Sequence, residues 1–454
     1  MSKHVNLLEG KILPVLTALS LPIMATSLIQ MAYNLIDMIW IGKLGSMAVA
    51  SIGAAGMFMW LSNGLATLAK MGGQIKVAHA LGARDKLTAA SYARSSLQMG
   101  ILFALLFGIL SLLFANQMIG FFQLNSPAVI QDAKLYLMIT CGLVIFSFLN
   151  QIFTGILTAM GNSKISFLAT SIGLIMNIVL DPLFIFGFGF IPAMGVMGAA
   201  IATVLAQAIV TLLFFIAVMK DTQLFDELHI TQKPDTAHTS EIFRIGLPTA
   251  IQSMLFSGIS MVIARLIAGW GDAAVAVQKV GSQIESISWM TAEGYAAALN
   301  SFVAQNYGAK NAGRIKEGYR LSMIVMLSWG VFCSLVLIVF PQPIFEIFIQ
   351  EQDVLPMGVD YLRILGVSQL FMCMEITTAG AFNGLGRTLP PSIVGVTLTA
   401  ARIPMAMVLG TAVGLNGVWW AITISSIGKG ITLLSWFIKE MRTSSFMKKS
   451  IQST

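Results

Sequence analysis

The chain has 454 residues, of which 56% are hydrophobic and only 10% are charged. Soluble globular proteins average about 25% charged residues, so this composition excludes an ordinary soluble domain and indicates a polytopic membrane protein. The net charge of +7 does not indicate a nucleic-acid partner, because the basic residues are sorted by loop. We therefore expect a lipid bilayer, and no nucleic acid, as the partner of the chain.

The first apolar stretch runs from Leu21 to Gly42 and is long enough to cross the roughly 30 Å hydrocarbon core. No small-residue cleavage site precedes it, so we expect no removable signal peptide. Asp37 lies in its second half, and the stretch holds no Lys or Arg to pair with it. A charged carboxylate inside a spanning helix costs about 2.5 to 3.5 kcal/mol and usually marks an ion or substrate path. The alternative is that Asp37 reaches headgroup water at the outer end of the helix.

Apolar runs and polar breaks along the rest of the chain predict twelve spans. The loops that follow spans two, four, eight and ten carry basic residues, as does the C-terminal tail with Lys439, Arg442, Lys448 and Lys449. By the positive-inside rule these loops and both termini face the cytoplasm. The predicted spans are 14–42, 48–75, 92–115, 130–159, 165–190, 195–219, 243–270, 273–300, 319–341, 357–384, 391–412 and 416–438.

The longest polar interruption, Lys220 to Glu241, divides the chain into two related halves. Each half contains six predicted spans, so we expect an N-lobe over 1–219, a cytoplasmic linker over 220–241 and a C-lobe over 242–454. Leu21-Pro22 recurs as Leu247-Pro248 at an offset of 226 residues, and Tyr136 recurs as Tyr361 at 225. Six is an even number, so both copies enter the membrane in the same orientation. The fold class predicted is an all-α membrane protein with twelve transmembrane helices in two pseudo-symmetric six-helix bundles.

Comparison of the two halves separates functional from structural polar residues. Asp37 corresponds to Ile263, Asn177 to Arg402 and Asp181 to Ala406. Residues needed for packing would tend to recur, so we expect only the first lobe to hold a cation. The oxygen-bearing side chains of four spans share one level, about 7 to 17 Å below the outer surface. They are Asp37, Tyr136, Asn177, Asp181 and Thr203.

These residue types suit a coupling ion. Two carboxylates held close in a low dielectric cannot both stay charged cheaply, so we expect proton coupling. A Na⁺ ion would instead use the oxygens of Asp37, Asn177, Asp181 and Thr203. The alternative for Asp181 is that it satisfies backbone groups freed by Pro182. The three cysteines lie in apolar segments and no histidine is central to a span, so we expect neither disulfides nor a metal site.

Other polar residues on the first and fourth spans could face a cleft between the lobes. Gln30, Tyr33, Asn34 and Asn150, together with Asp37, are the predicted substrate-binding residues. The many Met and Phe residues could add adaptable apolar contacts, but the alternative that they only fill the core is the commoner one.

A proline inside the first span is the predicted hinge. Pro22 removes one backbone hydrogen bond and allows a bend, although its recurrence as Pro248 is equally consistent with a fixed kink in both lobes. The second lobe has its own buried acids, Glu285, Glu293 and Glu375, whose participation the sequence leaves open. Glu285 could pair with Lys279.

At LPIM, YNLIDMIWIG, AHALGARDK, AQNYGAK, TAMGNSK, NIVLDPLFIFGFG and MGVMGAAIAT the chain resembles multidrug and toxic compound extrusion (MATE) transporters. It resembles in particular their prokaryotic NorM- and DinF-like members, over nearly its whole length. The resemblance implies that organic, mostly cationic compounds are exported in exchange for H⁺ or Na⁺. It also implies that the five residues at one level form the cation site and that the first helix bends at Pro22. Some members use acids in the seventh and tenth spans, where this chain has Phe256 and Met372.

The resulting prediction is a secondary transporter of the bacterial inner membrane, without a cofactor, acting as a monomer on drugs or toxic cations. Protonation of Asp37 or Asp181 from outside would bend span one and release the drug. The first alternative is a flippase for lipid-linked precursors, which would need a strongly cationic cavity. Most basic residues lie instead in the cytoplasmic loops, although Arg265, Lys279 and Arg402 lie within spans. The second alternative, a membrane-embedded hydrolase or transferase, would need a nucleophile and base within the spans, and the lack of a histidine central to a span argues against it. A passive channel fits poorly with the asymmetric placement of acids in the two lobes and with the internal repeat.

Overall fold

The computed structural model describes residues 5–122, 124, 126–189, 191–219, 224–228 and 232–443, without the side chains of Leu35, Ser46, Phe225 and Asp272. His4, His229, Lys448, Lys449 and part of the predicted linker lie outside the described residues.

Contacts divide the chain into two compact units. Unit 1 contains Val5 and Ala25–Ala250, and unit 2 contains Asn6–Met24 and the residues from Ile251 onward. The first part of helix α1 (Ile12–Lys43) therefore belongs to unit 2 and its second part to unit 1, and helix α9 (Thr236–Ala268) changes unit in the opposite direction. The units thus begin and end at other residues than the lobes expected from the sequence, and α9 begins inside the segment expected to be a linker.

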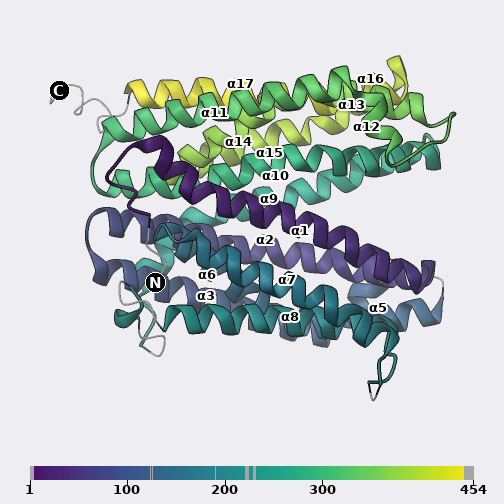
Figure 1. Cartoon of the computed structure of the whole chain (residues 1–454), viewed down its shortest axis with the longest axis horizontal. Coiled ribbons are helices and arrows are strands. Elements are labelled where there is room, and N and C mark those ends of the chain that lie inside the picture. The colour runs from purple at the N-terminus through teal and green to yellow at the C-terminus, as the bar shows by residue number, and fades with distance from the viewer. Residues whose placement is uncertain are drawn as a thin grey trace. The chain divides into compact units, whose positions relative to one another are not determined.

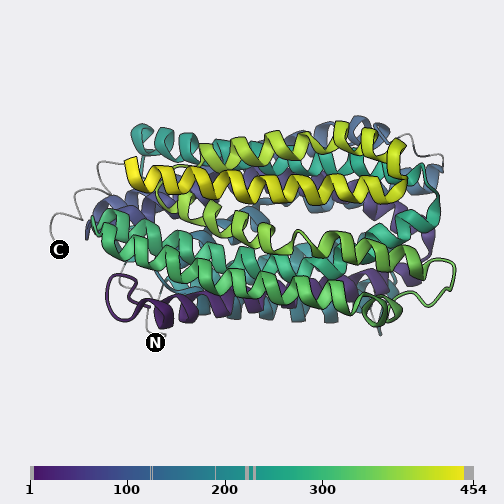
Figure 2. The ribbon, with the colours of Figure 1, turned by 90° about the horizontal axis from the view of Figure 1, so that it is seen from above.

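Helices make up each unit, and within each unit the long ones run along one another (Figures 1 and 2). Besides its share of α1 and α9, unit 1 contains α2 (Ser46–Gly82), α3 (Lys86–Leu113), α4 (Ala115–Gly120), α5 (Pro127–Gly142), α6 (Ile145–Ala159), α7 (Ser163–Phe186), α8 (Gly195–Val218) and the short η1 (Phe225–Glu227). Unit 2 contains α10 (Asp272–Gly308), α11 (Ala312–Val339), α12 (Pro341–Glu346), α13 (Leu355–Gly366), α14 (Gln369–Gly384), α15 (Leu389–Ala400), α16 (Arg402–Val413) and α17 (Leu415–Thr443).

Membrane-spanning character is strong in most of these helices. In the described part of the chain nine are long and apolar enough to cross a bilayer, and two bent pairs raise the number to eleven. The bends are 43° between α5 and α6 and 45° between α13 and α14. Helix α10 coincides with the eighth predicted span and has 37 residues, but its sequence is interrupted by Gln278, Lys279, Glu285 and Glu293. The predicted count of twelve spans is therefore not confirmed, although each predicted span coincides with a helix or a helix pair.

The internal repeat is visible in the backbone at the ends of α2 and α10. Arg84 and Lys310, which are related by the offset of 226 in the sequence, both adopt left-handed φ angles, 61° and 58°. The next residues cap the following helices alike: Asp85 accepts a bond from the Thr88 N–H at 3.0 Å, and Asn311 accepts one from the Arg314 N–H at 3.1 Å. A polar N-cap satisfies an amide that the first helical turn leaves without a partner.

Each unit has its own apolar core. In unit 1, Ala66, Ala104, Val144 and Phe148 form one buried cluster. In unit 2 the largest described cluster includes Tyr361 and Trp419, whose rings meet edge to face with centroids 5.1 Å apart. Burial of apolar side chains gains roughly 25 cal/mol for each Å² removed from contact with water. These cores hold the helices that carry the polar residues described next.

Candidate functional site

Two residues of helix α7 form the buried centre of a polar cluster in unit 1. Asn177 and Asp181 are separated by four residues, so they lie on one face of the helix. Only 2% of Asn177 and 0% of Asp181 is exposed. Asn177 Nδ2 donates to Asp181 Oδ2 at 2.7 Å and to the hydroxyl oxygen of Tyr33, on α1, at 2.9 Å. The amide of Asn177 therefore joins α7 to α1.

The second acid of the cluster comes from α1. Asp37 lies one turn beyond Tyr33, and its carboxyl group is within hydrogen-bonding range of the Asp181 carboxyl group. Two carboxyl groups form a hydrogen bond only when one of them carries a proton, because a carboxylate has no donor. The Oδ1 atom of Asp181 has no hydrogen-bond donor among the described residues. The pair therefore offers a place for a proton or a small cation.

Hydroxyl groups from two further helices complete the cluster. The Thr203 side chain, on α8, is within hydrogen-bonding range of the hydroxyl groups of Tyr33 and Tyr136. Thr203 Oγ1 donates to the backbone oxygen of Ala199 at 3.0 Å, so its oxygen is left to accept from a tyrosine. Both tyrosines also interact electrostatically with Asp37 and Asp181.

All five predicted ion-site residues therefore meet within unit 1. They come from four helices: α1, α5, α7 and α8. Carboxylate, amide and hydroxyl oxygens are ligands for protons and for hard cations such as Na⁺. Tyr33, a predicted substrate contact, also contacts the acid cluster directly. Its spacing of four residues from Asp37 is the sequence signal that could have placed it there.

The other predicted substrate contacts have different surroundings. Gln30 Nε2 donates to Asn34 Oδ1 at 3.1 Å along the surface of α1. Asn150 donates to the backbone oxygen of Gln207 at 2.9 Å and accepts from Thr211 at 2.8 Å, so its amide links α6 to α8. The role of these residues in substrate binding stays a prediction.

Pro22 lies inside α1, which continues as a helix from Ile12 to Lys43. The position of Pro22 is two residues before Met24, the last residue that α1 contributes to unit 2. The proline therefore lies close to the point at which α1 passes from one unit to the other.

Two predictions about acids in the second half were wrong. Glu285 does not pair with Lys279: it accepts bonds from the Tyr361 hydroxyl at 3.0 Å and from Gln369 Nε2 at 2.8 Å. Lys279 is six residues away on the same helix and exposed, and only residues three or four apart are neighbours on a helix surface. Glu293 is exposed rather than buried. Glu375 is largely buried and pairs with Lys429 at 2.9 Å.

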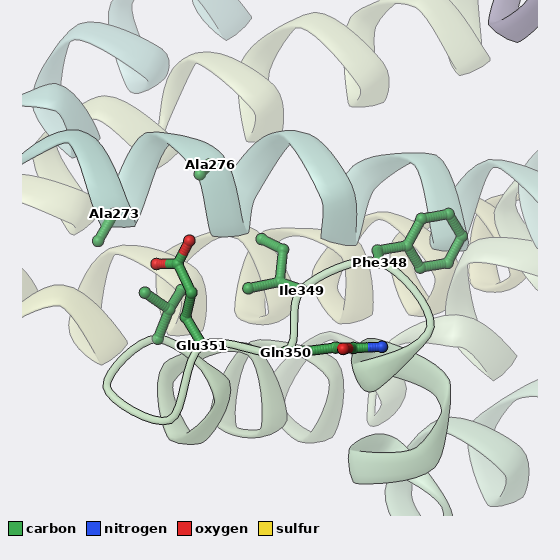
Figure 3. Close-up of a pocket in the computed structure, with 7 residues that line it drawn as sticks. Ala273, Ala276, Phe348, Ile349, Gln350 and Glu351 are labelled. Carbon is green, nitrogen blue, oxygen red and sulfur yellow. The ribbon is translucent and has the colours of Figure 1, made fainter.

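A pocket of about 750 Å³ lies at the first turns of α10 in unit 2 (Figure 3). In the figure, the Glu351 side chain extends toward the helix that carries Ala273 and Ala276. None of the predicted site residues lines this pocket, which is formed by Ala273, Ala276, Phe348, Ile349, Gln350, Glu351 and Val354.

Comparison with known proteins gives consistent results along the whole chain. Residues 22–183 and 248–408 match the MatE family, one match in each half. The probable multidrug resistance protein NorM of Thermotoga maritima is 29% identical over 434 residues, which cover 93% of this chain and 91% of that protein. The multidrug export protein MepA of Staphylococcus aureus is 26% identical over 412 residues, 89% of each chain.

A solved structure shares the fold. The crystal structure of MATE in the bent conformation superimposes with a TM-score of 0.90 at 25% identity, covering 99% of this chain and 100% of that one. The predicted all-α membrane fold and the predicted family resemblance are thereby confirmed.

Proposed function

Because this chain belongs to the MATE family of transporters, we propose that it exports organic, mostly cationic compounds in exchange for H⁺ or Na⁺. Members of the family are secondary transporters and not enzymes. The similar proteins of Thermotoga maritima and Staphylococcus aureus carry the names of multidrug resistance and multidrug export proteins. The similarity covers nearly the full length of both, which supports the same class of substrate here.

The coupling ion in this proposal binds between Asp37 and Asp181. Two observations carry it: the Asp181 carboxyl lies within hydrogen-bonding range of the Asp37 carboxyl, and the buried Oδ1 atom of Asp181 lacks a donor in the described part of the structure. A buried, uncompensated charge is costly, so a proton or cation that enters the pair is bound favourably. The direct approach of two carboxyl groups favours a shared proton over Na⁺ as the first candidate.

Ion binding would act on the shape of helix α1. Asp37 and Tyr33 lie on this helix and contact α7 and α8, so protonation changes the bonds that hold α1 against both. Pro22 removes one backbone hydrogen bond within α1, which makes it the place where the helix bends most easily. One charge moving through 100 mV supplies about 2.3 kcal/mol before any pH gradient is added.

The proposal places the protein in the bacterial inner membrane as a functional monomer. Basic residues in the loops after spans two, four, eight and ten support cytoplasmic termini. The alternative, a flippase for lipid-linked precursors, would need cationic groups available to a pyrophosphate. Within unit 2 the buried Lys429 is already paired with Glu375.

Transport into proteoliposomes tests the proposed function. Uptake of ethidium, a fluorescent organic cation, is measured first under a pH gradient alone and then under a Na⁺ gradient alone. We expect the pH gradient to drive ethidium against its own gradient. Ethidium movement that neither gradient drives would contradict the antiport. A response to the Na⁺ gradient alone would identify Na⁺, in place of the proton, as the coupling ion at the same site.

A further inference from the structure

A second buried polar cluster lies in unit 2, and two of its residues occupy positions related by sequence to the acid cluster of unit 1. Tyr361 recurs at the place of Tyr136, and Arg402 recurs at the place of Asn177, both at an offset of 225. The Tyr361 hydroxyl donates to Glu285 at 3.0 Å. The repeat has therefore kept a tyrosine beside an acid but has replaced the neutral amide by a guanidinium group.

Arg402 is fixed within this cluster by hydroxyl groups of α17. Only 9% of the residue is exposed. Its Nε atom donates to Ser425 Oγ at 2.5 Å, and Nη2 donates to Ser426 Oγ at 3.1 Å. The guanidinium group also interacts electrostatically with Glu375 and Glu285. Its position is thus set by neutral groups, and its charge acts on two acids.

The charged groups that face Arg402 come from three other helices. Glu285 lies on α10, Glu375 on α14 and Lys429 on α17, with the Lys429 amine 2.9 Å from the Glu375 carboxylate. Two cations and two acids balance in this cluster. In the unit 1 cluster the charged groups described above are Asp37 and Asp181, which are both acids.

The difference in charge has a direct physical consequence. A buried charge is tolerated when an opposite charge or several donors compensate it. In the unit 2 cluster Glu285 and Glu375 are compensated by side chains that belong to the protein, and arginine keeps its charge at any physiological pH. Among the described residues no Lys or Arg interacts with Asp37 or Asp181, so an ion from outside is needed to compensate the acids of the unit 1 cluster in this way.

We propose that Arg402 is a tethered counter-ion: in the second repeat its guanidinium group replaces the exchanged cation. Ion coupling is thereby confined to unit 1. Arg402 is then a residue that determines how many ions move for each exported molecule. The inference rests on the proposed antiport and specifies its stoichiometry. It also predicts that unit 2 holds a latent cation site, which removal of the guanidinium charge would open.

The number of protons exchanged per ethidium molecule tests this inference. The ratio is obtained in proteoliposomes from the pH gradient that just balances a known ethidium gradient, for the wild type and for Arg402→Gln. Loss of the tethered charge leaves the unit 2 cluster with one uncompensated acid, so we expect one additional proton per ethidium molecule. An arginine with a purely structural role would leave this ratio unchanged, whatever happened to the transport rate.

Three further variants separate charge from structure. Arg402→Lys keeps the charge and should keep the wild-type ratio. Arg402→Gln combined with Glu285→Gln removes one charge of each sign, and should restore both the wild-type ratio and any stability lost in the single variant. Lys279→Gln removes an exposed cation of α10 and serves as the matched control.

The possible failures are distinguishable. If the wild type does not couple ethidium movement to an ion gradient, the proposed function is wrong. If the wild type does so and Arg402→Gln has the same ratio, the tethered counter-ion is wrong and the proposed function stands. If Arg402→Gln does not fold, a ratio for the double variant that differs from the wild type overturns the inference.

Discussion

The side-chain amide of Asn177, on α7, donates to the hydroxyl oxygen of Tyr33, on α1, over 2.9 Å. The two residues are 144 positions apart in the sequence. The same amide also donates to Asp181, so one side chain of α7 connects the acid to Tyr33 on α1. The free energy that a buried network of hydrogen-bonded side chains contributes can exceed the sum of its pairwise bonds.

Removal of the Tyr33 hydroxyl should weaken ion binding. Tyr33→Phe leaves a buried Asn177 N–H group without this acceptor, which costs about 1 to 3 kcal/mol. We expect the proton concentration for half-maximal ethidium exchange to rise by roughly 5- to 150-fold. Tyr319→Phe is the matched control, since the Tyr319 hydroxyl bonds to Thr378 in unit 2 at 3.0 Å. If the proton dependence of exchange is unchanged in Tyr33→Phe, this hydroxyl does not contribute to ion binding.

Asp37→Asn should abolish efflux without preventing membrane insertion. The amide cannot be protonated, so the pair with Asp181 loses the exchange on which coupling depends. Resistance of producing cells and ethidium uptake in vesicles should both fall to background, with wild-type amounts of protein in the membrane. Asp360→Asn changes an exposed acid of unit 2 that accepts a bond from Asn416, and should keep activity. Full resistance in cells that produce Asp37→Asn would end the proposed mechanism.

The Glu375–Lys429 pair should matter for stability more than an exposed pair does. Lys429→Met leaves a largely buried carboxylate without its cation, and breaking a buried pair costs about 3 to 5 kcal/mol. The double change Lys429→Met with Glu375→Met should recover most of this loss. Thermal unfolding in detergent at one fixed heating rate measures the effect.

The matched control for this stability prediction is Arg387→Met. Arg387 pairs with Glu440; the Arg387 side chain is 52% exposed and the Glu440 side chain 15%. Because water reaches one partner of this pair, we expect it to contribute less to stability than a pair with both partners buried. Equal losses in Lys429→Met and Arg387→Met would contradict the difference in burial.

The two repeated helix caps should respond differently to acid. Bonds from the hydroxyl and backbone N–H of Thr88 lower the pKa of the Asp85 carboxyl, which caps α3. Because its pKa is lower in the folded state, Asp85 contributes stability at pH values above its unfolded pKa, about 3.9. This contribution disappears as the pH falls through the lower folded value. Asn311, which caps α11, does not titrate there.

Hydrogen exchange of the first turns of α3 and α11 measures this difference. Below about pH 4 the protection of the α3 amides should fall relative to α11, after correction for intrinsic exchange. Asp85→Asn should make the two turns respond alike. A relative loss of protection that persists in Asp85→Asn would assign the effect to another group.

The sequence by itself determined the membrane character, the helical spans and the repeat. Hydropathy and repeat offsets are local or linear properties, which is why each predicted span coincides with a helix or a bent pair. Asp37, Asn177 and Asp181 could also be predicted as site residues from the sequence, because uncompensated polar residues in apolar stretches are rare and costly. The i, i+4 spacing is enough to place Asn177 and Asp181 on one face of a helix, since that relation depends only on helical periodicity.

Only the tertiary structure decided which side chains meet. The rotation of each helix about its axis fixed the Tyr33–Asn177 bond, the Tyr361–Glu285 bond and the burial of Arg402 beside Ser425 and Ser426. It also placed Lys279 and Glu293 on exposed surfaces and divided α1 between two units. Partners that lie tens to hundreds of residues apart are selected by packing between helices, and a linear pattern of apolar and polar residues does not encode that geometry.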